Sequence, residues 1–350
     1  MTLRSDRPEL DLAIETALQR IRTRALPLGD SVVALSEALG RAARGGKRFR
    51  PALVCDAFQA FGGDTDEVPG LHQIAAAFEL LHAAFVVHDD VIDHDTVRRG
   101  VPNVAGEFRV RARTNGADAD GTHLLGETAA ILAGDLLLHE ALRLAATADV
   151  PPDARVRILD LLDDAVLVSA AGELSDVEHS VLPADADADE LLATAFHKTA
   201  VYSFRAPLLA GAVLAGASDR ALVRLEQDAD RLGLAFQLVD DLIGAFGSAE
   251  QAGRESGGDL RESKLTALVA LARQSAAWPQ VDSALQVART GPIAVRAAQR
   301  ALEASGAGTR LRELIDDTLD QVRTDDDEAL PRPARRMLHA LADRIQERMP

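Results

Sequence analysis

The stretch AAFVVHDDVIDHD (83–95) runs from apolar residues straight into a group of aspartates. A later stretch, FQLVDDLIGAFG (236–247), makes the same change at Asp240 and Asp241. Carboxylates beside an apolar helix face are costly unless a cation or a hydrogen-bond donor receives them. We therefore ask which fold the two segments belong to and which cation would bind their carboxylates.

Apolar residues elsewhere in the chain recur at spacings of three and four, as in Leu71, Ile74, Phe78, Leu81 and Phe85, which is typical of helices. Alanine is abundant and aromatic residues make up only 3% of the chain, which favours closely packed helices over sheets. No convincing strand pattern is visible. The sequence predicts an all-α fold of roughly a dozen helices. Their expected ranges are 9–25, 31–43, 51–62, 68–95, 122–149, 152–179, 188–215, 218–246, 263–276, 291–305, 308–323 and 331–348.

Three segments interrupt the helical pattern: 109–121, 182–190 and 247–264. They are rich in glycine, small or charged residues. We expect 109–121 to be a loop and 182–190 a turn that leads into a helix, whereas 247–264 is too long to be a plain turn. None has the composition of a flexible linker, and no repeat is visible. We expect one domain over residues 1–350.

Composition excludes several classes of partner. The 350 residues carry a formal net charge of -17, which argues against binding to nucleic acid or to an anionic membrane surface. No apolar signal region and no 18-residue apolar span occur. The single cysteine, Cys55, excludes an internal disulfide and indicates a buried, inert thiol. We expect a cytoplasmic protein without stable membrane insertion.

The acidic segments have a helical geometry. At 3.6 residues per turn, Phe78, His82, Phe85, Asp89 and Asp93 form one stripe, apolar at one end and anionic at the other. Bare carboxylates four residues apart repel each other, and Mg²⁺ would remove the repulsion because it binds carboxylates together with phosphates. The alternative is a solvated acidic helix end.

The second segment repeats the stripe with Leu232, Phe236 and Asp240. Two such helices facing each other would form an apolar cavity with carboxylates at its mouth. That shape suits a substrate with a hydrocarbon tail and a metal-bound diphosphate.

Basic residues occur in four further motifs: RGGKRFRP (44–51), TVRRG (96–100), HKTAVYSF (197–204) and DLRESK (259–264). Any one of them would usually be a solvated charged face. Their coincidence with two acidic helices instead favours a site for phosphate groups.

The order GGKRFRP, ELLHAAFVVHDDVID with RRG, HKTA, FQLVDD and GGDLRESK resembles the trans-isoprenyl diphosphate synthase (polyprenyl synthetase) family, including its actinobacterial geranylgeranyl diphosphate synthases. The likeness runs from residue 45 to residue 266. It implies an isoprenoid synthase fold with helices around a central cavity, and a homodimer. It also implies an Mg²⁺-dependent enzyme that condenses isopentenyl diphosphate with an allylic prenyl diphosphate.

The resemblance also implies roles for individual residues. Mg²⁺ would be bound by Asp89, Asp90, Asp93, Asp240 and Asp241. The allylic diphosphate would be held by Arg98, Lys198 and Lys264, and isopentenyl diphosphate by Lys47, Arg50, His82 and Arg99. Lys198, Thr199 and Gln237 would lie at the reacting centre.

The chain departs from the family pattern at three positions. Gly244 stands where the second acidic motif usually has a third aspartate, and we expect it to leave that motif one carboxylate short. Glu173 stands where glutamine is common, although Asp176 is retained. Arg254 stands where many members have lysine.

Product length depends on the residues one turn before Asp89. A bulky Phe85 about 6 Å below Asp89 should crowd the growing chain, whereas Ala84 is small. These residues favour a C20 product, geranylgeranyl diphosphate. Farnesyl diphosphate and longer polyprenyl diphosphates stay open, as do a class I terpene cyclase and a non-catalytic regulatory subunit.

Overall fold

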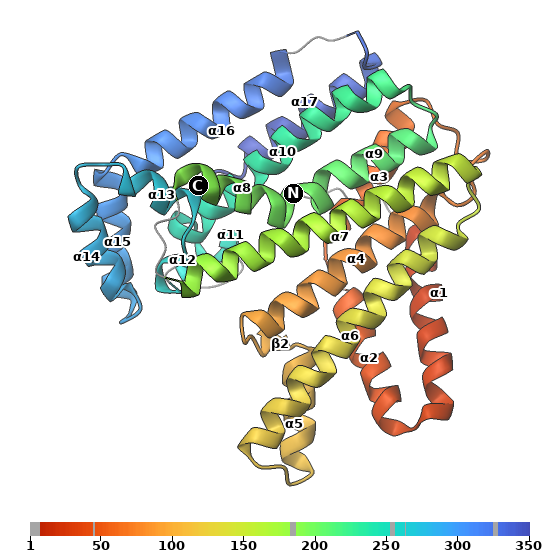
Figure 1. Ribbon diagram of the computed structural model, residues 1–350, viewed down its shortest axis with the longest axis horizontal. Helices are drawn as coiled ribbons and strands as arrows, with labels where there is room; N and C mark the ends of the chain where they lie inside the picture. The colour runs from red at the N-terminus through yellow and green to blue at the C-terminus, as the bar shows by residue number, and fades with distance from the viewer. Residues whose placement is uncertain (1–7, 45, 183–186, 253–255, 263, 325–327) are drawn as a thin grey trace. The chain divides into compact units, whose positions relative to one another are not determined.

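The computed structural model describes residues 8–44, 46–182, 187–252, 256–262, 264–324 and 328–350. Over these residues the protein is helical apart from one two-stranded hairpin (Figure 1), so the all-α prediction is confirmed. The chain divides into two compact units. One comprises Met1–Leu162 and Ala210–Gly216, and the other comprises Asp163–Leu209 and Ala217–Pro350. The expected single domain and its central cavity stay predictions.

The first unit is built from helices around one two-stranded hairpin. Its elements are α1 (Pro8–Ala25), the 3₁₀ turn η1 (Leu26–Leu28), α2 (Asp30–Arg44), α3 (Phe49–Ala60), α4 (Leu71–Ile92), β1 (Val97–Arg98), β2 (Val101–Pro102), α5 (Val104–Thr114), α6 (Ala119–Thr147) and the beginning of α7 (Pro152–Val181).

Helix α4 forms the centre of this unit. It contacts α1, α2, α3, α5 and α6, and Figure 1 shows α6 running beside it. Leu71, Ile74, Phe78 and Leu81 of the predicted apolar stripe are buried to 1% exposure or less. Burying side chains of this size contributes roughly 1.5–3 kcal/mol each, so this stripe is a main source of stability for the unit.

The second unit contains the remaining helices. They are the end of α7, α8 (Ala188–Ala195), the π-helix η2 (Phe196–Arg205), the part of α9 (Ala206–Leu214) before Ala210, α10 (Asp219–Phe246), α11 (Ala249–Ala252), α12 (Gly258–Arg261), α13 (Ala267–Arg273), α14 (Trp278–Ala288), α15 (Pro292–Ala304), α16 (Ala307–Thr324) and α17 (Arg332–Gln346). Helix α10 is the centre of this unit, since it contacts η2, α12, α13, α16 and α17.

Local sequence signals start several of these helices. Asn103, Asp118, Asp187 and Ser218 each accept a hydrogen bond from the backbone N–H three residues later, which is the N-cap arrangement. Asp187 and Glu190 form a full capping box. These caps fix where α5, α6, α8 and α10 begin.

Three structural predictions need correction. The expected helix 188–215 is α8, η2 and α9, because its middle adopts the wider π-helical winding. Residues 109–114 of the expected loop 109–121 are helical and belong to α5, and residues 119–121 belong to α6. The segment 247–264, which is too long to be a plain turn, contains α11 and α12. Helix α14 was missed because only Val281 and Ala288 of its residues are buried, which leaves a weak apolar pattern.

The expected helix 68–95 ends earlier than its sequence suggests. Helix α4 stops at Ile92, Asp93 caps it, and His94 has a φ of 58°. A non-glycine residue in the left-handed region breaks the helix, so Asp93 lies at the helix end rather than within it.

Cys55 is buried at 2% exposure, as expected. In the part of the chain that the structure describes, no helix has an apolar stretch that could cross a membrane.

Candidate active site

The first acidic cluster lies at the carboxyl end of α4, the central helix of its unit. Asp89 and Asp90 are in the last turn, and Asp93 follows directly. The Asp93 N–H donates to the Asp89 carbonyl over 2.8 Å. Asp89 is half-buried and Asp93 is exposed, so both carboxylates can meet a ligand from solvent.

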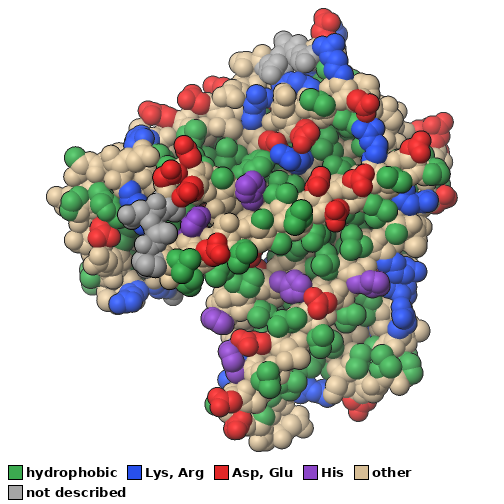
Figure 2. All heavy atoms as spheres, in the orientation of Figure 1, with side chains coloured by type: hydrophobic (Ala, Val, Ile, Leu, Met, Phe, Trp, Pro, Cys, Tyr) green, Lys and Arg blue, Asp and Glu red, His purple; other side chains and the backbone are tan. Residues whose placement is uncertain are grey.

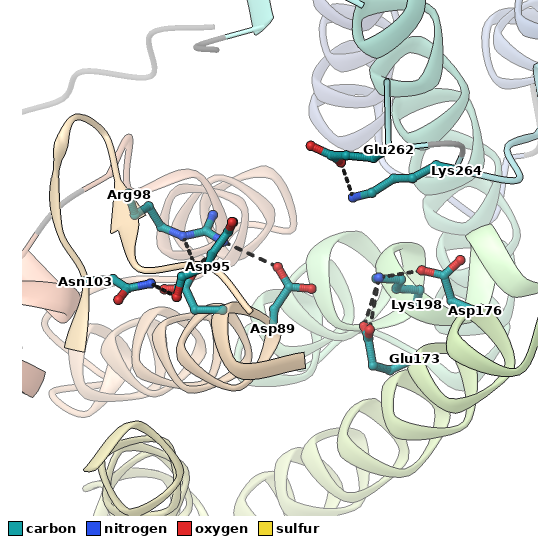
Figure 3. A network of polar contacts seen from close by, with 10 residues as sticks. Asp89, Asp95, Arg98, Asn103, Glu173, Asp176, Lys198, Glu262 and Lys264 are labelled. Atoms are coloured by element: carbon teal, nitrogen blue, oxygen red, sulfur yellow. Dashed lines mark hydrogen bonds and ion pairs between the residues drawn. The ribbon is translucent and has the colours of Figure 1, made fainter. Parts of the chain in front are cut away.

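A tight hairpin returns Arg98 to this cluster. Its loop residues Arg99 and Gly100 have φ values of 54° and 78°, as two-residue hairpin loops require. Nε of Arg98 donates to Oδ1 of Asp90 over 2.7 Å, and Nη2 approaches Oδ2 of Asp89 at 3.4 Å (Figure 3). The predicted diphosphate ligand Arg98 is therefore already linked to the predicted metal ligands.

Asp90 differs from its neighbours because it is buried, with 3% of its surface exposed. Burial raises the pKa of the Asp90 carboxyl, and the hydrogen bond from Arg98 acts in the opposite direction. Because Asp90 is buried and accepts a hydrogen bond from Arg98, it suits a supporting role in orienting that arginine.

Two of the predicted isopentenyl diphosphate ligands, Arg50 and Arg99, influence the charge of a third, His82. Burial, and then the guanidinium groups of Arg50, Arg99 and Arg98, hold the pKa of His82 well below its usual range. Such an influence requires the three cations to lie close to the imidazole. Residues from α3, α4 and the hairpin thus form one basic cluster around a neutral histidine.

The segment before α3 contributes to the same region. A Cβ built on Gly46 would lie 3.6 Å from Nη2 of Arg99, so this loop runs against the hairpin turn. Lys47 is exposed, whereas Arg48 is bound to Glu79 over 2.9 Å. Gly45 of the GGKRFRP motif lies outside the described residues.

In the second unit, Lys198 and Thr199 lie in the π-helix η2. π-Helical turns are uncommon and often occur at functional sites. Nζ of Lys198 donates to Oδ2 of Asp176 over 2.7 Å and to Oε1 of Glu173 over 3.1 Å (Figure 3). Glu173, a departure from the family pattern, is thus one of two carboxylates that hold this lysine.

Two glycines let η2 lie unusually close to its neighbours. A Cβ on Gly172 of α7 would lie 2.3 Å from the backbone N of Lys198, and a Cβ on Gly233 of α10 would lie 2.5 Å from Cβ of Ala200. Either side chain would force the π-helix to move. The position of Lys198 therefore depends on both glycines.

The second acidic cluster lies near the carboxyl end of α10. Asp240 forms an ion pair with Arg348, whose guanidinium group lies 4.2 Å from the ring centre of Phe236. A cation thus already faces the predicted metal ligand Asp240. Sequence reasoning missed Arg348 because 108 residues separate the pair and no local motif marks it.

Asp241 is buried at 7% exposure and bound on both sides. Nε2 of Gln237 donates to Oδ1 of Asp241 over 3.0 Å, and the Ala267 N–H donates to Oδ2 over 3.3 Å. Burial, with Asp259 and Asp240 nearby, raises the pKa of Asp241 to about 7 despite the hydrogen bond from Gln237. A divalent cation at Asp240 would favour the ionised form.

The last predicted cation, Lys264, lies 3.5 Å from Oε2 of Glu262 (Figure 3). Its backbone N–H donates to the carbonyl of Asp259 over 3.0 Å, which ties the segment after α12 into a turn. Arg254 and Ser263 lie outside the described residues.

The acidic clusters fit Mg²⁺ in donor type. Among the described residues, no three or more His, Cys, Asp or Glu side chains form a group that could hold a metal by themselves. Mg²⁺ usually takes one or two carboxylates and completes its octahedron with water and substrate phosphates. Asp89 with Asp93, or Asp240, supplies such a partial set. In the first unit Arg98 lies beside Asp89 and suits a phosphate group.

The chain was compared with protein families and known proteins. The family model described as polyprenyl synthetase matches residues 33–304. The chain is 32% identical over 227 residues to a geranylgeranyl diphosphate synthase of Sulfolobus acidocaldarius, covering 64% of this chain and 62% of that protein. It is 34% identical over 270 residues to a farnesyl diphosphate synthase of Geobacillus stearothermophilus, covering 74% and 82% respectively.

A solved structure agrees over nearly the whole chain. The geranylgeranyl pyrophosphate synthase from Corynebacterium glutamicum, complexed with isoprenyl diphosphate and magnesium, has a TM-score of 0.89 and 29% identity, with 97% of each chain covered. The aligned part spans just over three fifths of the Sulfolobus protein's own length.

Proposed function

This chain belongs to the polyprenyl synthetase family, a family of prenyltransferases, and we propose that it is an Mg²⁺-dependent isoprenyl diphosphate synthase. The reaction joins isopentenyl diphosphate to an allylic prenyl diphosphate and gives a short all-trans product. The observation that carries the proposal is the pairing of Arg98 with Asp89 and Asp90, beside the cluster of His82, Arg50 and Arg99. One helix end thus offers both metal ligands and anion ligands.

The proposed role of each charged residue follows from its charge. Bound Mg²⁺ would take up negative charge as the allylic C–O bond breaks. Arg98, Lys198 and Lys264 would hold the departing diphosphate, and the cluster around His82 would hold the isopentenyl diphosphate in line for attack. The neutral imidazole of His82 can donate one hydrogen bond to a phosphate oxygen without adding a charge.

Thr199 and Gln237 suit the reacting centre because each has an oxygen that can face a carbocation. Gln237 uses its amide N–H on Asp241, which fixes the direction of its carbonyl oxygen. Thr199 is half-buried in η2, next to Lys198.

The proposal is tested with purified protein, Mg²⁺, isopentenyl diphosphate and dimethylallyl, geranyl or farnesyl diphosphate in turn. We expect elongated linear diphosphates, and chelation of Mg²⁺ should abolish them. No elongation with any primer would sink the proposal and favour a regulatory subunit. Cyclic hydrocarbons would favour a terpene cyclase instead.

For product length we propose geranylgeranyl diphosphate, because Phe85 is positioned one turn before Asp89 on α4. Ala84 is fully buried and belongs to the packed interior, whereas Phe85 is half-buried. Relatives include both geranylgeranyl and farnesyl diphosphate synthases. The role of Phe85 in limiting the product length is therefore tested with a product assay.

Phe85→Ala should lengthen the main product by at least one five-carbon unit, because it removes the bulk that limits the chain. Chromatography of the dephosphorylated products measures this. Phe108→Ala is the control, since Phe108 is a buried phenylalanine that belongs to α5 and not to α4. Unchanged products in Phe85→Ala would show that another residue sets the length.

We further propose a homodimer formed through the exposed face of α6. Apolar side chains are visible on the surface over this helix (Figure 2). The exposed ones are Leu124, Leu125, Ile131, Leu132, Leu136 and Leu142. At 3.6 residues per turn they all fall on one side of the helix, and a contiguous apolar surface commonly marks an interaction site.

Leu132→Glu should convert the dimer to a monomer, because it buries a charge in that interface. Light scattering after size-exclusion chromatography measures the mass. Val287→Glu on α14 changes a similarly exposed residue and should leave the mass unchanged. A monomeric parent, or a dimeric Leu132→Glu variant, would contradict the proposed interface.

A further inference from the structure

Helix α4 carries a buried acid one turn before His82. This acid, Glu79, has 4% of its surface exposed, and its spacing of three residues places it on the same side of the helix as His82. The proposed reaction does not use this carboxylate. A buried charge is costly unless another group receives it, so the partner of Glu79 shows what the residue contributes.

That partner is the guanidinium group of Arg48. Its Nη1 donates to Oε1 of Glu79 over 2.9 Å and to the Ala43 carbonyl over 3.0 Å, and its Nε lies 3.7 Å from Oδ1 of Asp11. Of these two acids Asp11 is exposed and Glu79 is buried. One side chain thus joins the segment before α3 to α1, to the end of α2 and to α4, with Glu79 as its buried anion.

The backbone at Arg48 has a conformation that needs such support. Arg48 has a φ of 52° and is the N-cap of α3. A non-glycine residue in the left-handed region is disfavoured and persists where its surroundings hold it. The contacts of the Arg48 side chain with α2 and α4 oppose the relaxation of this backbone and thereby fix the start of α3.

The same carboxylate lies beside the backbone on the other side of Lys47. Gly46 has a φ of 110°, which glycine tolerates best, and a Cβ built on it would lie 3.4 Å from Oε1 of Glu79. The exposed Lys47 therefore lies between one residue packed beside Glu79 and another bound to it. Arg50 follows in the first turn of α3.

We propose that Glu79 is a positioning residue for isopentenyl diphosphate. Through Arg48 it anchors the segment 46–50 on α4, and this segment then presents Lys47 and Arg50 to the diphosphate. The inference rests on the proposed function, because it takes those two cations and His82 as the ligands of that substrate. It assigns Arg48 to the support of the segment and not to the substrate. Loss of Glu79 should therefore weaken the binding of isopentenyl diphosphate and spare the allylic diphosphate.

The test measures binding apart from turnover. Titration calorimetry gives the Kd of isopentenyl diphosphate without an allylic substrate, and steady-state kinetics gives KM for each substrate. Glu79→Gln keeps the size of the side chain and removes its charge. It should raise the Kd and KM of isopentenyl diphosphate by ~10-fold or more, because small displacements of positioning groups have large effects. KM for the allylic diphosphate should stay within about twofold of the parent, because its ligands are other residues.

Arg48→Met and the double variant show whether the two residues act together. Arg48→Met keeps a long side chain and removes the guanidinium group, so it should raise the Kd of isopentenyl diphosphate to a similar extent. The double variant of Glu79→Gln and Arg48→Met should stay within about threefold of the larger single effect, whereas independent contributions would multiply. Independent effects, or an effect of Arg48→Met alone, would place Arg48 on the diphosphate itself and overturn the proposal.

Glu140→Gln is the matched control, because Glu140 is a fully buried acid of α6 in the same unit, bound by Arg20 of α1. Both Glu→Gln variants should lower the midpoint of thermal unfolding, but Glu140→Gln should leave the Kd and KM of isopentenyl diphosphate unchanged. A parental Kd in Glu79→Gln, or an equal loss of affinity in Glu140→Gln, would overturn the proposal. If the parent makes no product from any primer, but its binding of isopentenyl diphosphate weakens in Glu79→Gln, the proposed function fails and the positioning role of Glu79 stands.

Discussion

Asp89→Ala is expected to lower kcat/KM for elongation by ~10³-fold or more. A metal ion that neutralises a leaving diphosphate contributes several kcal/mol to transition-state stabilisation, and about 4 kcal/mol corresponds to ~10³-fold. Asp89 is a partly exposed carboxylate of its cluster, next to the buried Asp90. Without Asp89 the substrate should still bind, but the negative charge of the leaving diphosphate should be poorly neutralised.

The fold should survive this change. Arg98 approaches the Asp89 side chain at 3.4 Å, with both groups partly exposed, and exposed pairs contribute about 0–1 kcal/mol. Asp89→Ala should therefore lower kcat/KM in steady-state kinetics and leave the temperature of thermal unfolding nearly unchanged. Asp135→Ala is the control, because Asp135 is an exposed acid of α6 facing His88. A loss of less than tenfold in Asp89→Ala would mean that Asp89 is not a principal metal ligand.

The helical fold could be read from the sequence because it depends on local patterns. Apolar spacings located α4 and α10 within a few residues, and the caps Asp187 and Ser218 mark where α8 and α10 begin. The same rules failed where structure departs from ideal winding. The π-helical winding of η2 covers only ten residues within a longer helical run, which is too short for the apolar pattern of FHKTAVYSFR to show a change of period. The hairpin was missed because its strands are two residues long.

The candidate site was predictable as a set of residues but not as a set of contacts. Motif order identified Asp89, Lys198 and Asp240, since each belongs to a short local pattern. It could not show that Arg348 binds Asp240, or that Asp259 fills the space beside Gly244. Those contacts join segments that are distant in sequence. A glycine in the sequence also does not show whether the space beside it is empty or is occupied by another side chain.

Lys198→Ala is expected to lower kcat/KM for the allylic substrate by ~10²-fold, mainly through a higher KM. A lysine that meets a phosphate oxygen makes a charge-assisted hydrogen bond, and losing one or two such bonds costs about 3 kcal/mol. Glu173 and Asp176 now hold its ammonium group at 3.1 and 2.7 Å. They fix the position of Lys198, and the arrival of a diphosphate adds a third anion to the same cation.

A purely structural lysine would behave differently. If Lys198 served only to neutralise Glu173 and Asp176, then Lys198→Ala would lower the unfolding temperature and leave KM unchanged. The matched control is His197→Ala, since His197 is exposed on the same π-helix and should leave both quantities unchanged. Glu173→Gln tests the position of the ammonium group, because it removes one anion and keeps a hydrogen-bond acceptor. We expect it to alter KM for the allylic substrate less than threefold, since Asp176 still holds the lysine, whereas Gly172→Val should match Lys198→Ala by pushing the π-helix away from α7.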